Sequence, residues 1–274
     1  GDYLQPGLSA EQAQNTTIKS LTPHATHNGS DTLTRKLDHK CFFQIGPLGS
    51  IQIRTLMAYA RSKNYKRVAV VTDNSALGQI IAKFFKIGLE KSGAKVVVDE
   101  VIPAGSKSAV PQMQKVRAEK PQAIFQAGVL SREMVLFFRA YHQLGMKQPI
   151  LGSFNLSIPS YLRTAKGLME GVAFIDAFDP AKPEAQAFIT AYKKEYGKAP
   201  YSLPAYGWDD MNFVLQAIKR AGSTDKTKLW VGALGAKGAP YDFSKGRAGF
   251  NPQGAVVRVI KDNDHGPVVH SGTK

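Results

Sequence analysis

The sequence predicts a protein of the α/β class, with a parallel sheet covered by helices on both faces. The first observation is that β-rich runs return about every 27 residues in the middle of the chain. These runs are RVAVVT (67–72), AKVVVDE (94–100), QAIFQAG (122–128) and PILGS (149–153). The second observation is that amphipathic stretches fill the intervals, at 78–93, 110–120 and 131–145. Successive strand–helix–strand units of this kind build a parallel sheet.

The stretch VAVVTDNSALGQ (68–79) predicts a buried strand, a polar loop and the start of a helix. In that helix Ile80, Ile81, Phe84, Phe85 and Gly88 recur at helical spacing and form the apolar face, with lysines on the other face. Gly93 ends the helix. The 73–77 loop is placed to present side chains to a ligand; the alternative is an ordinary strand-to-helix turn with Asp73 or Ser75 as the N-cap.

The two ends of the chain predict a second lobe. Residues 8–15 have a helical pattern and 17–23 a strand pattern, while helices are expected at 183–196, 203–221 and 225–235. The last stretch, 246–270, has turn signals at Asn251-Pro252 and His265-Gly266-Pro267 between β-rich runs. A helical block followed by a terminal hairpin suggests that the chain passes between two lobes.

Composition restricts the class of protein. The chain has 274 residues, 43% of them hydrophobic, which suffices for one large or two modest cores. No apolar run approaches the ~20 residues of a membrane span. No signal segment opens the chain, which indicates a mature or recombinant form, or a protein that is never exported. Cys41 is the only cysteine, so no internal disulfide forms, and its apolar neighbours predict a core position.

The net charge of +15 favours attraction of anions. The basic residues are scattered, as in RSKNYKR (61–67), so they predict solvated helix faces and argue against a nucleic-acid interface. An enzyme is the weaker alternative, because no G-x-S-x-G, H-E-x-x-H, phosphate-binding glycine loop or zinc-ligand spacing is present. Asp209 and Asp210 are neighbours on a helix and diverge by about 100°, so they do not converge on one site.

Nearly the whole chain resembles, in order, the substrate-binding proteins of branched-chain amino-acid-type ABC transporters, which have the type I periplasmic binding fold. Their strand–loop–helix patterns are similar to LTPHATHNG (21–29), CFFQIGPLGSIQ (41–52), YKRVAVVTDNSALGQ (65–79), PAGSKSAVPQMQKVRAEKPQAIFQAG (103–128), LGMKQPILGS (144–153), GVAFIDAFDP (171–180), AFITAYKKEYGKAP (187–200), AYGWDDMNFVLQAIKRAGS (205–223) and GFNPQGAVVRV (249–259).

The resemblance implies two α/β lobes, 1–44 with 178–252 and 45–177 with 253–274, joined by three crossovers. It implies a ligand bound in the cleft, delivery to an inner-membrane ABC permease, a periplasmic or membrane-anchored location, no cofactor and no catalysis. Family members carry one more βαβαβ stretch before the GDYLQPG position. The first lobe is therefore expected to be incomplete, through an incomplete sequence or a true truncation.

The resemblance also implies a ligand site. In the first lobe, hydroxyls and backbone N–H groups of two loops hold a carboxylate. These loops correspond to YLQ, with Tyr3 and Gln5, and to HAT, with His24, Ala25 and Thr26; Thr26 is the strongest single candidate. His24 is expected to offer its backbone, or to be an exposed loop histidine. Further candidates are Asp73, Asn155, Leu203 and Tyr206.

The second lobe departs from the amino-acid-binding pattern. Positions that hold two aromatic residues and an acid in the family are Leu77, Val129 and Phe154 here. An ammonium placed there without a counter-charge would cost several kcal/mol, and cation–π attraction would return only about 1–2 kcal/mol. The expected ligand is therefore a carboxylate with an apolar or aromatic body. The alternatives are a branched-chain or other amino acid, a sensing domain of the same fold, or a shifted alignment in which Asn155, Ser157 or Asp176 supplies the polar contact.

Overall fold

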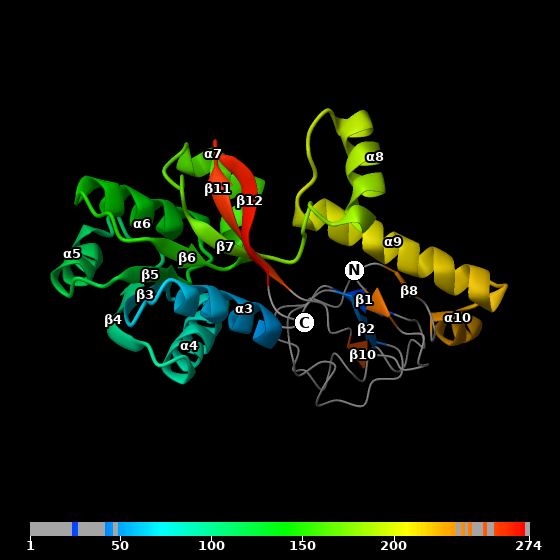
Figure 1. Cartoon of the computed structure of the whole chain (residues 1–274), viewed down its shortest axis with the longest axis horizontal. Coiled ribbons are helices and arrows are strands. Elements are labelled where there is room, and N and C mark those ends of the chain that lie inside the picture. The colour runs from blue at the N-terminus through cyan, green and yellow to red at the C-terminus, as the bar shows by residue number, and fades with distance from the viewer. Residues whose placement is uncertain are drawn as a thin grey trace. The chain divides into compact units, whose positions relative to one another are not determined.

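The computed structural model describes residues 24–26, 42–45, 49–233, 237–238, 241–242, 249–250 and 255–271. The chain divides into two compact units, joined where it passes from Ile51 to Gln52, after Asp176 and before Ala255 (Figure 1). The predicted helix at 8–15, the predicted strand at 17–23, Cys41 and the predicted turn at 251–252 lie outside the described residues.

The unit formed by Gln52–Asp176 and Ala255–Thr273, called unit 2, contains a seven-stranded sheet in the order β12-β11-β7-β6-β5-β3-β4. Strands β4, β3, β5, β6 and β7 pair in parallel, and β11 is antiparallel to both β7 and β12. Its elements are α3 (Gly49–Ser62), β3 (Arg67–Asp73), α4 (Ala76–Lys91), β4 (Lys95–Ile102), α5 (Val110–Ala118), β5 (Ala123–Gln126), α6 (Ser131–Gln143), β6 (Ile150–Gly152), η2 (Phe154–Ser157), α7 (Pro159–Ala165), β7 (Ala173–Asp176), β11 (Val256–Lys261) and β12 (Asp264–Ser271). The predicted α/β class and the four predicted strands are confirmed.

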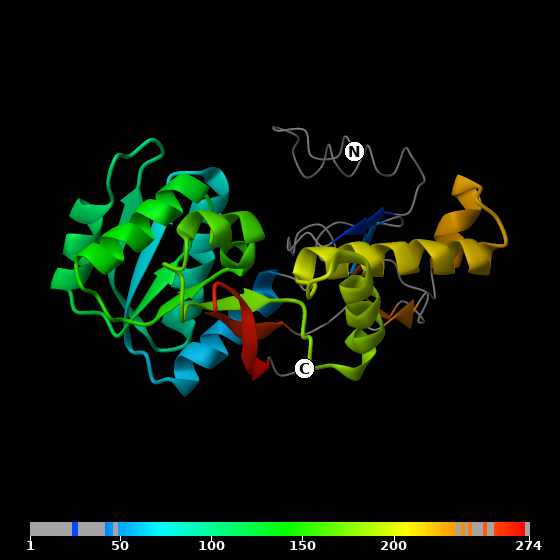
Figure 2. The same cartoon turned by 90° about the horizontal axis from the view of Figure 1, so that it is seen from above.

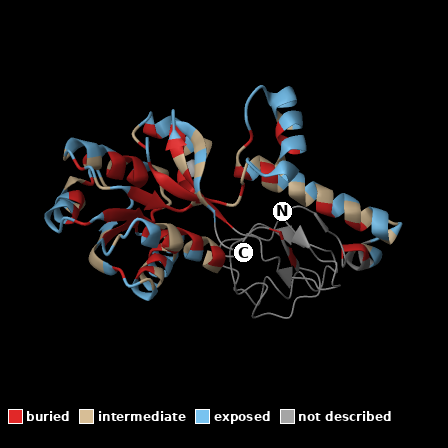
Figure 3. Ribbon diagram, in the orientation of Figure 1, coloured by how far each residue is buried: buried red, intermediate tan, exposed pale blue. Residues whose placement is uncertain are grey.

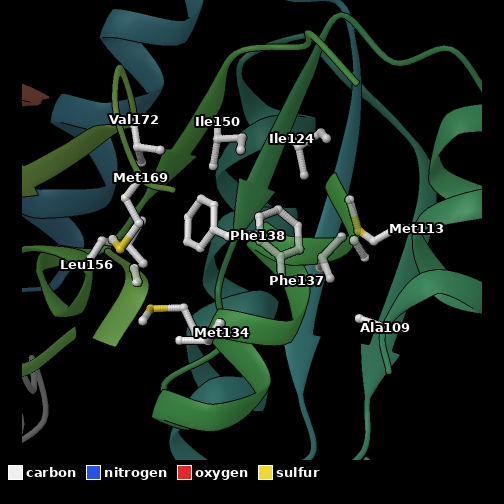
Figure 4. Close-up of a cluster of buried hydrophobic side chains, with 14 of the residues drawn as sticks. Ala109, Met113, Ile124, Met134, Phe137, Phe138, Ile150, Leu156, Met169 and Val172 are labelled. Carbon is white, nitrogen blue, oxygen red and sulfur yellow. The ribbon is translucent and has the colours of Figure 1, made fainter. Parts of the chain in front are cut away.

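Helices cover both faces of this sheet, and the central strands β3, β5, β6 and β7 are almost entirely buried, whereas the outer strands β4 and β12 are partly exposed (Figure 3). On one face, α3 and α4 pack on Val68, Val70 and Phe125. On the other, α5, α6 and α7 enclose a second core, in which Phe137 and Phe138 of α6 meet edge to face at 5.0 Å (Figure 4). Burial on both faces explains why these strands are continuous apolar runs in the sequence.

The predicted helix after β3 forms, but its buried face differs from the prediction. Ser75 is the N-cap, since its hydroxyl accepts a hydrogen bond from the Gly78 N–H. The buried residues of α4 are Gly78, Ala82, Phe85 and Leu89. Ile80 and Phe84 are 51% and 53% exposed, so two of the five residues assigned to the apolar face point to solvent. With Leu77 and Ile87 they form an exposed apolar stripe on α4.

The predicted C-terminal hairpin is also confirmed, but its turn lies at other residues than predicted. The chain reverses at Asp262 and Asn263, both with positive φ (53° and 57°), which suits a tight hairpin turn. His265, Gly266 and Pro267, predicted as the turn, lie inside β12. The pairing of β11 with β12 is irregular there, with register shifts between Val257 and Ile260, and this irregularity accommodates the glycine and the proline.

The other unit, called unit 1, has a parallel sheet in the order β1-β2-β10 and an antiparallel pair β8–β9. Helix α9 packs on this sheet through Phe213, whose ring lies 5.0 Å from that of Phe43. Figure 2 shows α8 beside the N-terminal half of α9, where Phe188 and Trp208 are 5.4 Å apart. The elements are β1 (His24–Thr26), β2 (Phe42–Gln44), η3 (Pro183–Ala185), α8 (Gln186–Tyr196), α9 (Ser202–Ala221), α10 (Lys226–Ala233), β8 (Lys237–Gly238), β9 (Tyr241–Asp242) and β10 (Gly249–Phe250). The three helices predicted after residue 180 are confirmed.

Candidate functional site

The candidate site in unit 2 lies at the carboxyl ends of β3, β5 and β6. In parallel sheets covered by helices, ligands bind beyond these ends, where the loops are free to present side chains. The loops here are 74–75, 127–130 and 153–158, and they contain the predicted residues Val129, Phe154 and Asn155. The candidates Asp73 and Leu77 flank the first of these loops.

Asp73 ends β3 and is 1% exposed. Its Oδ1 accepts hydrogen bonds from the Ser75 N–H, at 2.9 Å, and from the Ser75 hydroxyl. Its Oδ2 accepts the N–H groups of Val129 and Leu130, at 2.5 and 2.7 Å. Both oxygens are thus committed to neighbouring loops, and the carboxylate ties the loop after β3 to the loop after β5. This geometry supports a positioning role for Asp73; direct contact with a ligand stays a prediction.

Two glycines make this arrangement possible. A Cβ atom at Gly78 would lie 2.6 Å from Asp73 Oδ1, and one at Gly128 would lie 2.9 Å from Asp73 Oδ2. Both distances are too short for real contacts, so any larger residue would displace the carboxylate or a loop. The close approach at Gly128 had no signal in the sequence, because Gly128 and Asp73 meet only in the folded sheet.

Both backbone polar groups of Val129, the N–H and the carbonyl, are hydrogen-bonded. Its N–H donates to Asp73, and its carbonyl accepts a hydrogen bond of 2.5 Å from the hydroxyl of Tyr161 in α7. Burial, followed by the nearby charge of Asp73, raises the pKa of Tyr161, so its hydroxyl stays a donor at neutral pH. Tyr161 was missed by sequence reasoning, since its partner is 32 residues away.

The three apolar candidates follow three neighbouring strands. Leu77, in the first turn of α4, is 52% exposed, whereas Val129 and Phe154 are half-buried. Phe154 begins the short helix η2 directly after β6. Asn155, next to it, is 6% exposed, and its amide nitrogen has no hydrogen-bond partner.

Asp176, one of the alternative polar contacts, is already engaged within unit 2. Asp176 is fully buried, and its Oδ2 accepts a hydrogen bond of 3.1 Å from Arg258 Nη1. Arg258 also donates to the carbonyls of His265 and Gly266, so the pair sits in a satisfied network. The charge of Asp176 is therefore neutralised within unit 2. The side chain of Ser157 lies outside the described residues.

The candidates of unit 1 are described only in part. Tyr3 and Gln5 lie outside the described residues. His24, Ala25 and Thr26 form β1, which pairs with β2, so this stretch is a strand where the resemblance implied a loop; only its backbone is described. Leu203 and Tyr206 lie in α9, and Leu203 is exposed.

A groove of about 700 Å³ lies between α8 and α9, and neither Leu203 nor Tyr206 lines it. The lining residues are Phe188, Ala191, Tyr192, Glu195, Tyr196, Pro204, Gly207, Trp208 and Met211. On another face of α9, burial and the neighbouring Asp210 raise the pKa of Asp209 to about 7. Within the described ranges, no group of three or more His, Cys, Asp or Glu side chains is placed to hold a metal ion, and no helix has the length and apolarity to cross a membrane.

Comparisons with known proteins agree with this architecture. The pattern of the periplasmic binding protein family matches residues 9–258. The Leu/Ile/Val-binding protein homolog 3 of Brucella melitensis is 28% identical over 86% of this chain and 63% of its own length. The chain thus spans less than two thirds of that relative.

Two solved structures are similar in fold. The leucine binding protein LivK of Thermotoga maritima has a TM-score of 0.78 and 23% identity, covering 95% of this chain and 77% of its own. A solute-binding protein of an ABC transporter from R. palustris, solved with benzoate, has a TM-score of 0.78 and 20% identity, covering 96% of this chain and 74% of its own.

Proposed function

Because the chain belongs to the periplasmic binding protein family, we propose that it is the extracytoplasmic solute-binding component of an ABC transporter. It binds a small ligand without transforming it and delivers the ligand to a membrane permease. The relatives and neighbours are named as binding proteins, which supports a binding role over an enzymatic one. The location that follows is the periplasm, or the outer face of the membrane.

The proposed ligand is a carboxylate with an apolar or aromatic body. The observation that carries this proposal is that Asp73 and Asp176, two buried carboxylates at this edge of the unit 2 sheet, already accept hydrogen bonds within the protein, as does the buried Glu133 of α6 from the Gly105 N–H. Asp73 is bound by loop N–H groups and Asp176 by Arg258. The resemblance aligns Phe154, at the start of η2, with the family's acid, so on this alignment an ammonium would have no counter-charge there, at a cost of several kcal/mol.

A branched-chain amino acid is the second candidate, because the Brucella relative and the Thermotoga structure are named for leucine and its relatives. The neighbour solved with benzoate shows that this fold also holds an aromatic carboxylate. Calorimetry with leucine, isoleucine, valine, benzoate and branched aliphatic carboxylates separates the two. Micromolar or tighter binding of the amino acids, with no binding of the acids, would reject the proposed ligand.

The residue that decides between them is Phe154. Replacing it with an acid, Phe154→Glu, should weaken carboxylate binding at least tenfold, because two negative charges then approach each other. The same variant should gain measurable affinity for an α-amino acid. The matched control is Phe154→Leu, which removes the ring and adds no charge; it should bind α-amino acids no better than the native protein does.

A further inference from the structure

Three buried polar atoms at the carboxyl ends of β5 and β6 have no hydrogen-bond partner. They are Gln126 Oε1, Ser153 Oγ and Asn155 Nδ2, in residues that are 3%, 6% and 6% exposed. A buried donor or acceptor without a partner costs about 1–3 kcal/mol, so three in one region call for an explanation.

These atoms belong to the same edge of the sheet as the proposed ligand wall. Gln126 is the last residue of β5, and its Cα partner in β6 is Gly152. Ser153 follows Gly152, and Ser153 and Asn155 stand on either side of Phe154. The amide of Gln126 is oriented by a hydrogen bond of 3.3 Å from its Nε2 to the Gly128 carbonyl, in the loop that Asp73 fixes.

The chemistry of the three atoms selects the kind of group that satisfies them. Asn155 Nδ2 only donates, Gln126 Oε1 only accepts, and the Ser153 hydroxyl does both. An ammonium only donates and a carboxylate only accepts, so either would leave part of the set unpaired. A hydroxyl both donates and accepts, and it carries no charge that needs neutralising.

We infer that the ligand is a hydroxylated carboxylate, and that Asn155 and Ser153, assisted by Gln126, bind its hydroxyl group. This inference rests on the proposed function, because it presupposes a carboxylate whose apolar body lies against Leu77, Val129 and Phe154. It makes Asn155 and Ser153 specificity-determining residues. In the absence of ligand, water meets the same donor and acceptor requirements.

The test compares each acid with its hydroxylated derivatives by calorimetry. The probes are benzoate and 4-methylpentanoate, each beside its monohydroxy isomers. The native protein should bind at least one hydroxylated isomer about tenfold tighter than its parent, which corresponds to about 1.4 kcal/mol. In Asn155→Leu the gain should fall below about threefold.

Two further variants distinguish loss of the hydroxyl contact from loss of folding. Ser153→Ala is a smaller change that should also reduce the gain, even if Asn155→Leu folds poorly. Asn212→Leu is the matched control, since Asn212 of α9 donates to the Trp208 carbonyl of its own helix and should leave the gain intact. Melting temperature, measured without ligand, shows whether each variant is folded.

The outcomes are distinguishable. If neither parent acid nor any derivative binds, the proposed ligand class is wrong, and the inference falls with it. If the parent acids bind and no hydroxyl improves affinity, only the inference is overturned, and bound water alone satisfies the three atoms. A gain that persists undiminished in both Asn155→Leu and Ser153→Ala would assign the hydroxyl to other residues and likewise overturn it.

Discussion

One carboxylate, that of Asp73, joins the loop after β3 to Val129 and Leu130 in the loop after β5, which lie 56 and 57 residues further along the chain. Its local partner Ser75 fits an ordinary turn, and the sequence predicted a capping role for one of the two. The partners Val129 and Leu130 were beyond prediction, because the contact depends on β3 and β5 lying side by side. Sequence patterns therefore predicted the strand, loop and helix around Asp73 but not the hydrogen bonds that join the two loops.

Asp73→Asn should destabilise the protein by about 2–3 kcal/mol, since an amide group cannot accept at both positions and leaves buried N–H groups unpaired. Urea unfolding measures this change. Asp99→Asn is the control: Asp99 pairs with Lys86 at the surface, and its loss should cost less than about 1 kcal/mol. Equal losses in the two variants would contradict the role given to Asp73.

Helix α4 shows which features of a single helix can be predicted from the spacing of its apolar residues. The recurrence of apolar residues fixed the existence and limits of the helix, but α4 has apolar residues on two opposite faces. Spacing alone does not tell which face meets the sheet. The C-terminal turn is a similar case, because Asp262 and Asn263 are a weaker turn signal than the Gly-Pro pair that β12 accommodates.

Substitutions on the buried and the exposed face of α4 should affect the stability of unit 2 to very different degrees. Phe85→Ala should destabilise unit 2 by about 3–5 kcal/mol, because Phe85 is fully buried and contacts Phe125. Phe84→Lys, one residue earlier, should change stability by less than about 0.5 kcal/mol, because its side chain is 53% exposed. Thermal unfolding measures both effects; a large loss of stability in Phe84→Lys would show that the stripe is covered in solution.

Helix α9 should make stability depend on pH through Asp209. Its pKa is raised to about 7 in the folded state from an ordinary value of 3.8, so folding favours the protonated form. The resulting stability is present in full below about pH 4 and is lost as pH rises through about 7. Asp209→Asn should remove this slope and be more stable at pH 8 by about 2 kcal/mol. Thermal melts from about pH 4 to 8 test this, with Glu195→Gln on exposed α8 as the control that keeps the slope.

At the scale of the whole molecule, two of the passages between the units lie beside a buried ion pair. The chain leaves unit 2 after Asp176 and re-enters before Ala255, and Asp176 is opposite Val256 in the pairing of β7 with β11. Arg258, two residues further along β11, pairs with Asp176. The two-lobed architecture was predictable from the change of pattern along the chain; this pair was not, since its members are 82 residues apart.

Removing one partner of the Asp176–Arg258 ion pair should destabilise the protein, whereas replacing both partners should not. Arg258→Met removes the guanidinium that pairs with the buried Asp176 and should destabilise unit 2 by about 3–5 kcal/mol. The double variant Arg258→Met with Asp176→Leu should recover most of that loss, because both buried charges are gone. Chemical denaturation of the three proteins gives the coupling energy; a double variant as unstable as the single one would mean that Arg258 acts mainly through the His265 and Gly266 carbonyls.

The proline inside β12 has a consequence for how copies of the protein meet. β12 is an outer strand of the unit 2 sheet, and an outer strand offers unpaired backbone groups to which another chain can add. Pro267 has no N–H to offer, and the register shifts between β11 and β12 bend the strand away from a flat template. This border of the sheet is thereby protected against edge-to-edge growth into fibrils. A β-branched residue in place of Pro267 would restore the backbone N–H, and a strand of another copy could then pair with β12.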